Sequence, residues 1–234
     1  MIFSPTTPRE EILRTCRLLV ASGDVHEVRI PRAGHRGTIA GYFDDAERLA
    51  DAVLAIDGIV PGVYLTLNPC DRSLFARATN RLKEHARDTT SDANILRRLW
   101  LMIDFDPVRP AGISSTNKEH GRAIAAACGA WDDLWGAGFP DPVVADSGNG
   151  AHLLYRVELP NDPEATEIFK HILAGVAAYC APDDVAIDQT VFNAGRITKL
   201  YGTMACKGDN LPDRPHRRSR LLEIPDRLAV LEVR

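Results

Sequence analysis

The chain has 234 residues, of which 45% are hydrophobic and 26% are charged, so it has the composition of a globular protein with a sizeable buried core. It contains no apolar run near the ~18 residues that a membrane-spanning helix needs, and no membrane role is indicated. The formal net charge of −4 argues against a protein that coats nucleic acid through a surface that is basic overall.

The start of the chain and the cysteines indicate a cellular compartment. The sequence MIFSPTTPREEILRTC lacks the basic segment and the long apolar segment of a secretory signal, so we expect a cytoplasmic protein. The five cysteines are odd in number and at least 26 residues apart, so they form neither a zinc-binding CxxC pair nor a disulfide framework. Reduced thiols in a cytosol explain them best.

The first 95 residues alternate between helices and strands. A threonine cap, a proline and two acidic residues predict a helix over 8–21. Short strands are expected at 25–30, 37–43 and 62–69. An amphipathic helix that ends at Gly58 is expected at 44–58. A polar segment, KEHARDTTSDANI, comes next, so we place the boundary of a first αβ lobe near residue 95.

The rest of the chain also alternates between strands and helices. We expect a strand at 99–107, a long helix at 116–138 and a hairpin around an Asn-Gly turn at 142–159. A second helix at 162–180 and a short strand at 184–188 should follow. The last piece, PDRLAVLEVR, starts a predicted helix that no glycine or proline ends. This leaves open that the chain is a fragment of a longer protein.

The run LWLMIDFDP, residues 99–107, places two aspartates inside one of the most apolar stretches of the chain. Asp104 and Asp106 are two apart on a strand and share one face, whereas Ile103 and Phe105 point the other way. Buried carboxylates are costly unless something neutralises them, and a divalent cation is the simplest partner. The alternative is a strand end whose aspartates cap a helix or meet an arginine.

The segment DSGNGAH, residues 146–152, is a second candidate. Gly148 and Gly150 remove the Cβ atoms where backbone N–H groups approach a phosphate. An Asn-Gly hairpin turn needs such glycines whatever the protein does, so this reading stays open. His152 lies next to the turn and is either a functional side chain or a satisfied structural histidine.

The segment DVAIDQTVFNAGRITKLYGT, residues 184–203, supplies a third carboxylate and two cations. Asp188 ends a short apolar run. Arg196 and Lys199 can neutralise a triphosphate, one as a fork and the other as a point charge. Otherwise Asp188 is a turn residue and both cations are exposed.

The densest basic stretch is RPHRRSR, residues 214–220. It is either a solvated loop or a phosphate-contacting segment of a template-binding surface. The candidate contacts are its four arginines, Arg214, Arg217, Arg218 and Arg220.

Together these stretches resemble the archaeo-eukaryotic primase superfamily. An apolar strand with DxD (LMIDFD), a small-x-His element (GAH) and an apolar run ending in Asp (VAID) follow the order of its three motifs, at intervals of 46 residues from Asp106 to His152 and 36 from His152 to Asp188. The similarity is greatest to the primase-polymerase (prim-pol) domains of plasmids, phages and integrated elements, where SGNGAHLLYRVELP and an R-x-x-K-L-x-G-T stretch are familiar in form. It covers about residues 24–223.

The resemblance implies an α/β (α+β) fold of two lobes with the active site in the cleft between them. Residues 1–95 would form the N-terminal αβ lobe, and residues 96–234 the catalytic lobe, built on a sheet like that of an RNA-recognition motif (RRM-like).

It also implies roles for single residues. Asp104, Asp106 and Asp188 would be catalytic ligands of two Mg²⁺ or Mn²⁺ ions, and His152 would contact the incoming nucleotide's phosphates. The implied nucleotide-binding residues are Ser147, Asn149, Gly150, His152, Arg196 and Lys199. Asn68 and Tyr42 are assigned only a place near the nucleotide or the template. The zinc-binding Cys/His cluster of many relatives has no counterpart, so no zinc is expected; extension of a primer is expected, and de novo priming stays open.

The implied function is that of a DNA primase-polymerase, a nucleotidyltransferase that replicates a plasmid, phage or integrated element. Its partners would be single-stranded or primed DNA template, (d)NTPs and a replicative helicase domain or protein, and it would be associated with the nucleoid or the mobile element. The alternatives are a metal-dependent phosphoesterase or nuclease, a DxD glycosyltransferase, and a non-catalytic replication-initiation DNA-binding module. The last should be basic overall, which the net charge of −4 disfavours.

Overall fold

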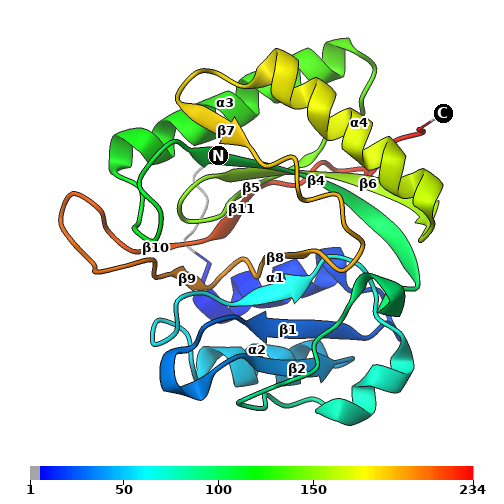
Figure 1. The fold of residues 1–234 in the computed structure, drawn as a ribbon, viewed down its shortest axis with the longest axis vertical. Helices are drawn as coiled ribbons and strands as arrows, with labels where there is room; N and C mark the ends of the chain where they lie inside the picture. Colours follow the sequence, from blue (N-terminus) through cyan, green and yellow to red (C-terminus); the bar gives the residue numbers. More distant parts are fainter. Residues whose placement is uncertain (1–5, 234) are drawn as a thin grey trace.

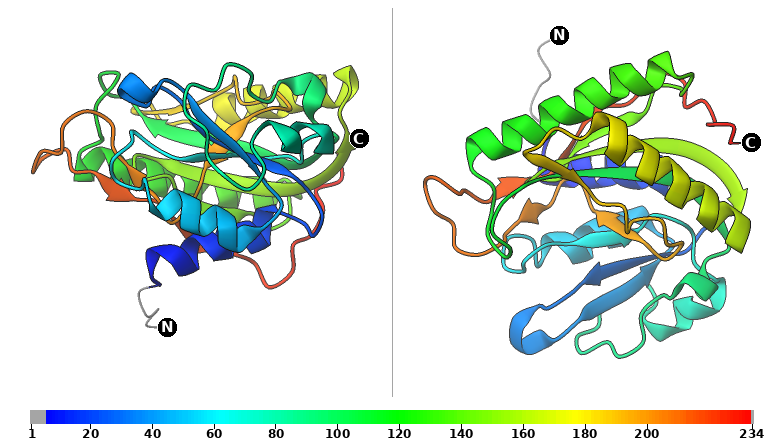
Figure 2. Two further views of the ribbon diagram at one scale, coloured as in Figure 1. Left: turned by 90° about the horizontal axis from the view of Figure 1, so that it is seen from below. Right: turned by 45° about the horizontal axis from the view of Figure 1, so that its top comes forward.

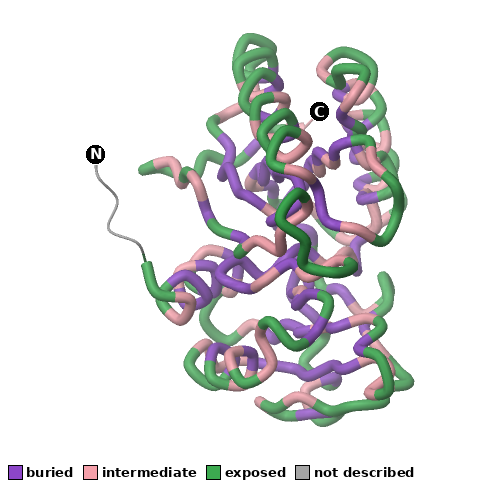
Figure 3. Tube along the Cα trace, turned by 90° about the vertical axis from the view of Figure 1, so that its left-hand side faces the viewer, coloured by how far each residue is buried: buried purple, intermediate pink, exposed green. Residues whose placement is uncertain are grey.

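The structure is a computed structural model that describes residues 6–233. A four-stranded sheet and a five-stranded sheet form two lobes, and a two-stranded ribbon lies beside them (Figure 1). One continuous cluster of buried apolar side chains joins the lobes, and buried positions gather between the sheets (Figure 3). Among the described residues, no helix combines the length and the apolarity that crossing a bilayer requires.

The first lobe begins with helix α1 (Pro8–Leu19), which confirms the helix predicted near the start. Thr7 and Glu10 cap it reciprocally: the Thr7 hydroxyl accepts from the Glu10 backbone N–H, and the Glu10 carboxylate accepts from the Thr7 backbone N–H. Helix α2 (Ala46–Leu54) is shorter than predicted, and Gly58 lies in the turn after it, at φ +80°.

The sheet of the first lobe has the order β2-β1-β3-β8, with every neighbouring pair antiparallel. Its strands are β1 (His26–Ile30), β2 (Ile39–Phe43), β3 (Tyr64–Thr66) and β8 (Ile197–Lys199). The fourth strand comes from far along the chain, because β8 pairs Lys199 with Tyr64 and Ile197 with Thr66. The segment beyond residue 95 therefore completes the sheet of the segment before it.

The second lobe follows a β-α-β-β-α-β order. Its elements are β4 (Arg97–Pro107), α3 (Asn117–Gly136), β5 (Val143–Asp146), β6 (Ala151–Pro160), α4 (Pro163–Cys180) and β7 (Val185–Ile187). The sheet order is β11-β5-β6-β4-β7, with every pair antiparallel and β11 (Arg220–Glu223) added at one edge. Helices α3 and α4 lie over one face (Figure 2). This is a ferredoxin-like arrangement, so the expected α+β fold with an RRM-like sheet is confirmed.

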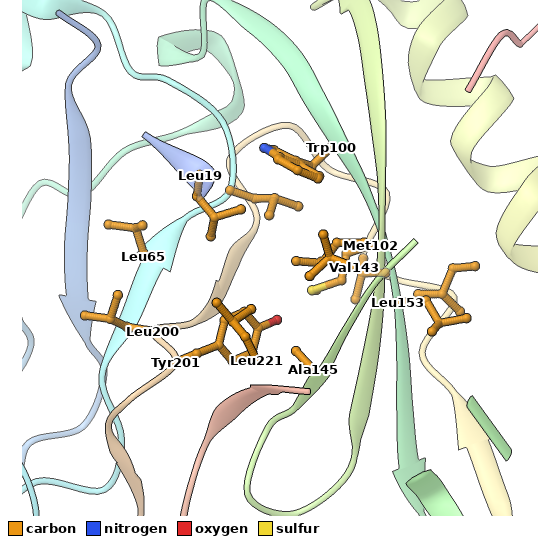
Figure 4. Packing of buried hydrophobic residues seen from close by; sticks show 14 of the residues in the cluster. Leu19, Leu65, Trp100, Met102, Val143, Ala145, Leu153, Leu200, Tyr201 and Leu221 are labelled. Carbon is orange, nitrogen blue, oxygen red and sulfur yellow. The ribbon is translucent and has the colours of Figure 1, made fainter. Parts of the chain in front are cut away.

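Strand β4 joins the two lobes through one of its faces. Trp100 and Met102 are 1% and 3% exposed and point toward the first lobe, whose Leu19, Leu65 and Leu200 belong to the same buried cluster (Figure 4). The opposite face of β4 packs under the helices through Leu99, Leu101, Ile103 and Phe105. The apolar run thus packs on both of its faces within the one continuous core.

The predicted hairpin is formed by β5 and β6, but its turn is not centred on Asn-Gly. The Ser147 backbone N–H donates to the Gly150 carbonyl at 3.0 Å, and Gly148, not Asn149, has the positive φ, at +91°. A glycine at the first central position is what a type II′ turn requires. Gly150 instead allows close packing, because a Cβ there would lie 2.1 Å from the Phe105 carbonyl oxygen.

The helix predicted over 225–234 is wrong for the described residues. Residues 225–233 contain no helix; Val230 bridges Arg156 in parallel, and the Leu231 N–H donates to the Arg156 carbonyl at 2.7 Å. An extended chain lets Leu231 enter the core, at 6% exposure. Tertiary packing has overridden local helix propensity here.

Gly150→Ala should lower the free energy of unfolding by about 1–3 kcal/mol, since neither backbone can yield without displacing a strand. Gly121→Ala in α3 is the control: a Cβ there meets nothing within 4 Å, and the change should stabilise the protein by about 0.5–1 kcal/mol. Urea denaturation measures both. A Gly150→Ala protein as stable as the wild type would contradict the close approach.

Candidate active site

The two aspartates of β4 line a pocket of about 240 Å³ between the two sheets. Asp104 and Asp106 follow Trp100 and Met102 at two-residue intervals along β4, so all four side chains lie on the same face of the strand. From the part of the first lobe that precedes residue 95, Pro61 and Tyr64 line the pocket. The remaining lining residues are Met102, Ser147, Asn149, His152, Arg196, Ile197, Thr198, Lys199, Ala205 and Lys207.

His152 lies directly across from Asp104 in the sheet. Its Nε2 is 3.3 Å from Asp104 Oδ1, and its Nδ1 is 2.7 Å from the buried Tyr201 hydroxyl. An ionised carboxylate can only accept, so a neutral imidazole carries its proton on Nε2 and takes the Tyr201 hydroxyl as a donor at Nδ1. Tyr201 thereby fixes the orientation of the ring.

The pKa of Asp104 lies below its usual range. Burial alone would raise this pKa, but the His152 imidazole outweighs burial together with Lys207 and Arg196. Asp104 is therefore ionised at neutral pH and is available as an oxygen ligand.

Asp106 has a protein partner of its own. Its Oδ1 accepts from Arg109 Nη1 at 2.8 Å, and its side chain is 45% exposed. This pairing is the arginine contact that the sequence left open as an alternative. The second carboxylate oxygen of Asp106 has no bond to a described residue.

Asp188 lies next to the pocket but does not line it. Its backbone N–H donates to the Asp104 carbonyl at 3.0 Å, and its carboxylate accepts from the Thr190 N–H and hydroxyl at 2.8 and 2.7 Å. Within residues 6–233, no group of three or more His, Cys, Asp or Glu is arranged to hold a metal. The role of Asp188 as a third ligand stays a prediction.

Three cations line the same pocket. Arg196 donates through Nη2 to the Thr190 carbonyl at 2.7 Å, while its buried Nε has no hydrogen-bond partner. Lys199 is 4% exposed and donates to the Met204 carbonyl at 2.6 Å. Burial lowers the pKa of Lys199 to about 7. A pocket with an orphaned guanidinium N–H and a desolvated ammonium is suited to an anion.

The hairpin supplies the polar wall of the pocket. Asn149 Oδ1 accepts from the Ser115 N–H at 2.9 Å, so this oxygen is used to hold the turn. The Ser147 hydroxyl accepts from the Gly150 N–H at 3.0 Å. Ser147 and Asn149 reach the pocket, whereas Gly150 does not line it. Their nucleotide contacts stay predictions.

All four arginines in 214–220 have a polar partner within the protein. Arg214 forms a two-pronged pair with Glu119 at 2.9 and 3.1 Å, Arg217 donates to Ser115 and Asn117, and Arg218 pairs with Asp57. Arg220 has the most exposed side chain of the four, at 65%, and its Nε lies 3.7 Å from Asp146 Oδ2. Template contact by these arginines stays a prediction.

Three further residues belong to the site, although the sequence analysis did not single them out. Lys207 and Tyr64 line the pocket, and Tyr201 orients His152. Tyr201 lies two residues after Lys199 in the KLYGT stretch, so its place in that motif could have marked it as a site residue. Tyr64 lies in the strand predicted at 62–69, but neither it nor Lys207 was predicted to be a site residue.

The two residues assigned only a general place lie elsewhere. Asn68 bridges backbone groups, accepting from the Leu99 N–H and donating to the Ala194 carbonyl. Tyr42 lies on β2, in the wall of a different depression.

Comparison with known proteins places the fold. No family model matches the chain, and no curated protein matches its sequence. Two crystal structures share its architecture at 11% identity: primase RepB′, with TM-score 0.53 over 92% of this chain and 56% of that one, and the catalytic domain of primase RepB′ in complex with initiator DNA, with TM-score 0.51 over 93% and 85%. The chain has the fold of a primase catalytic domain. It spans about half the length of the first RepB′ structure.

The donor set of the pocket fits Mg²⁺ or Mn²⁺. Mg²⁺ is usually held by one or two carboxylates together with waters and substrate phosphates, without an all-protein cage. Asp104 is ionised and Asp106 has a free oxygen on the same face, so both would be the protein's ligands.

The double variant Asp104→Asn/Asp106→Asn should raise the Kd for Mn²⁺ at least tenfold, about 1.4 kcal/mol or more, because both anionic ligands are lost. Titration calorimetry without nucleotide measures this. Asp226→Asn, at an exposed position outside the pocket, is the control and should leave the Kd unchanged. Equal Mn²⁺ affinity of wild type and double variant would contradict the ligand assignment.

Proposed function

We propose that the protein is a DNA primase-polymerase, which adds nucleotides to a primer 3′-hydroxyl under the direction of a template. The observation that carries the proposal is one pocket lined by two carboxylates and three cations, between the two lobes of a primase catalytic fold. Primase RepB′ was crystallised with initiator DNA, which supports DNA as the partner of this chain.

The cationic and the anionic residues of the pocket would have different roles. Arg196, Lys199 and Lys207 would bind the triphosphate, with the unpartnered Nε of Arg196 as a free donor. His152 is held by Tyr201 at Nδ1, so its one N–H, at Nε2 beside Asp104, is the group that would donate to a phosphate oxygen. Mg²⁺ or Mn²⁺ bound at Asp104 and Asp106 would lower the pKa of the primer hydroxyl and neutralise the leaving pyrophosphate.

The rigid sheet keeps these groups in place. Asp104 and His152 are neighbours in the β4–β6 register, and Lys199 is fixed by the pairing of β8 with β3. Binding a nucleotide here therefore requires little rearrangement of the backbone, which preserves the alignment that transfer needs.

The wild-type protein should extend a primer on a DNA template when supplied with deoxynucleotides and Mn²⁺. Asp104→Asn should reduce extension to background, because the ionised carboxylate is lost while the side-chain volume is kept. Gel analysis of a labelled primer measures both, with Asp226→Asn as the control. Shortening of the primer by the wild type, with no extension, would support a nuclease instead.

Nucleotide affinity should depend on pH through Lys199. Burial depresses its pKa to about 7, Asp57 and Cys206 oppose that shift, and Arg218 and Lys207 add to it. A bound triphosphate stabilises the ammonium, so binding takes up a proton once the pH exceeds about 7, and Kd should rise by up to about tenfold per pH unit above that.

Fluorescence titration of a labelled nucleotide without metal, from pH 6.5 to 9, tests this coupling. In Lys199→Met the rise should disappear, and the Kd should match at all pH values the weak binding of the wild type at high pH. A rise of equal slope in Lys199→Met would assign the proton to another group.

A further inference from the structure

A concentrated basic surface lies on the first lobe, away from the pocket. We define the basic edge as residues 32–36 and 77–87. It contains six Arg or Lys residues and one acid, Glu84, in a chain whose net charge is −4. The six are Arg32, Arg36, Arg77, Arg81, Lys83 and Arg87.

Most of this charge is not used inside the protein. Glu84 pairs with Arg36 at 3.5 Å, and Arg77 donates to the Tyr42 hydroxyl at 3.2 Å. Within residues 6–233, the side chains of Arg32, Arg81, Lys83 and Arg87 form no ion pair, and all four residues are exposed. Asp88 lies just beyond the edge, and Asp44 accepts a hydrogen bond from the Asn80 side chain within it, at 2.9 Å.

The backbone holds these cations in a fixed array. Residues 78–86 run beside β2 as an irregular outer strand, with Lys83 and Ala40 exchanging backbone hydrogen bonds at 2.9 and 3.0 Å. Asn80 and His85 have positive φ, +46° and +51°, and kink the strand. A Cβ on Gly41 would lie 2.1 Å from the Arg81 carbonyl oxygen, so the two chains are in close contact.

Three of the six cations line one depression of about 520 Å³. Arg77, Lys83 and Arg87 line it together with Tyr42, His85 and two acids, Glu84 and Asp88. Residues 78–86 run alongside β2, so the cations of 77–87 are spread along one edge of the sheet, over at most about 33 Å. A linear array of unpaired cations matches a linear polyanion better than a single small ion.

The basic edge is separate from the pocket. The sheet order β2-β1-β3-β8 puts β2 at the opposite edge from β8, about 14 Å away at the usual strand spacing (Figure 1). Charges on the edge therefore do not act on a nucleotide in the pocket directly.

We propose that the basic edge binds the phosphate backbone of a nucleic-acid strand that leads to the active site. The proposal rests on the proposed function for its partner. The strand is either the single-stranded template or the primer–template duplex, and the test has one arm for each.

The test measures DNA binding by fluorescence anisotropy, without nucleotide or metal, over a series of salt concentrations. The variant is Lys83→Gln/Arg87→Gln. The matched control is Arg17→Gln/Arg227→Gln, which removes two exposed cations that have no ion pair within residues 6–233. Thermal denaturation checks that both variants fold as the wild type does.

If both side chains contact phosphates, the slope of log K against log[salt] should fall by about 1.4 for a single strand or about 1.8 for a duplex. Affinity at 0.1 M salt should then fall by about 25-fold to 60-fold, while the control keeps the wild-type slope. The arm that responds identifies the strand.

An unchanged slope in both arms would overturn the proposal, and so would an equal loss in the control. The result is independent of catalysis: absence of primer extension with a salt-sensitive loss of binding would contradict the proposed function and leave the basic edge supported.

Discussion

The structure depends on one face of β4, which both joins the two lobes and carries the acidic residues of the pocket. Over its first half this face carries Trp100 and Met102, whose burial holds the two lobes together, and over its second half it carries Asp104 and Asp106 at the pocket. A strand that is apolar on both faces must be anchored on both faces. The acids are therefore held on one of the most constrained segments of the fold, and their separation is set by the pleat rather than by a loop.

Much of the fold could be predicted from local patterns. The capping box at Thr7, the helices α3 and α4 and the strands on either side of DSGNGAH all follow from short-range signals. The common face of Asp104 and Asp106 follows from the two-residue period of a strand. Local patterns gave wrong predictions where tertiary contacts or the turn backbone set the conformation. The segment 225–233 is extended because Leu231 enters the core. The hairpin turn is centred one residue earlier than Asn-Gly because Gly148 takes the positive φ.

The candidate site could be predicted only in part, because its geometry depends on register and on long-range pairing. That His152 faces Asp104 is a property of the β4–β6 register, which no single strand reveals. That Lys199 is desolvated follows from the pairing of β8 with β3, and a reading of KLYGT as exposed cations could not anticipate it. Tyr64 and Lys207 reach the pocket from a strand and a loop that carry no motif. Their contribution appears only once both lobes are assembled.

The pairing of β3 with β8 also has a consequence for how the protein folds during synthesis. It joins Tyr64 to Lys199, so one sheet cannot be finished until most of the chain has left the ribosome. Contacts of such high sequence separation slow folding, because a long loop must close before they form. Until then β3 presents an open edge, which is a template for wrong pairing with another chain. The second lobe has a nearly local order of strands and helices and can form first, giving β8 and the apolar face of β4 a surface on which the first lobe closes.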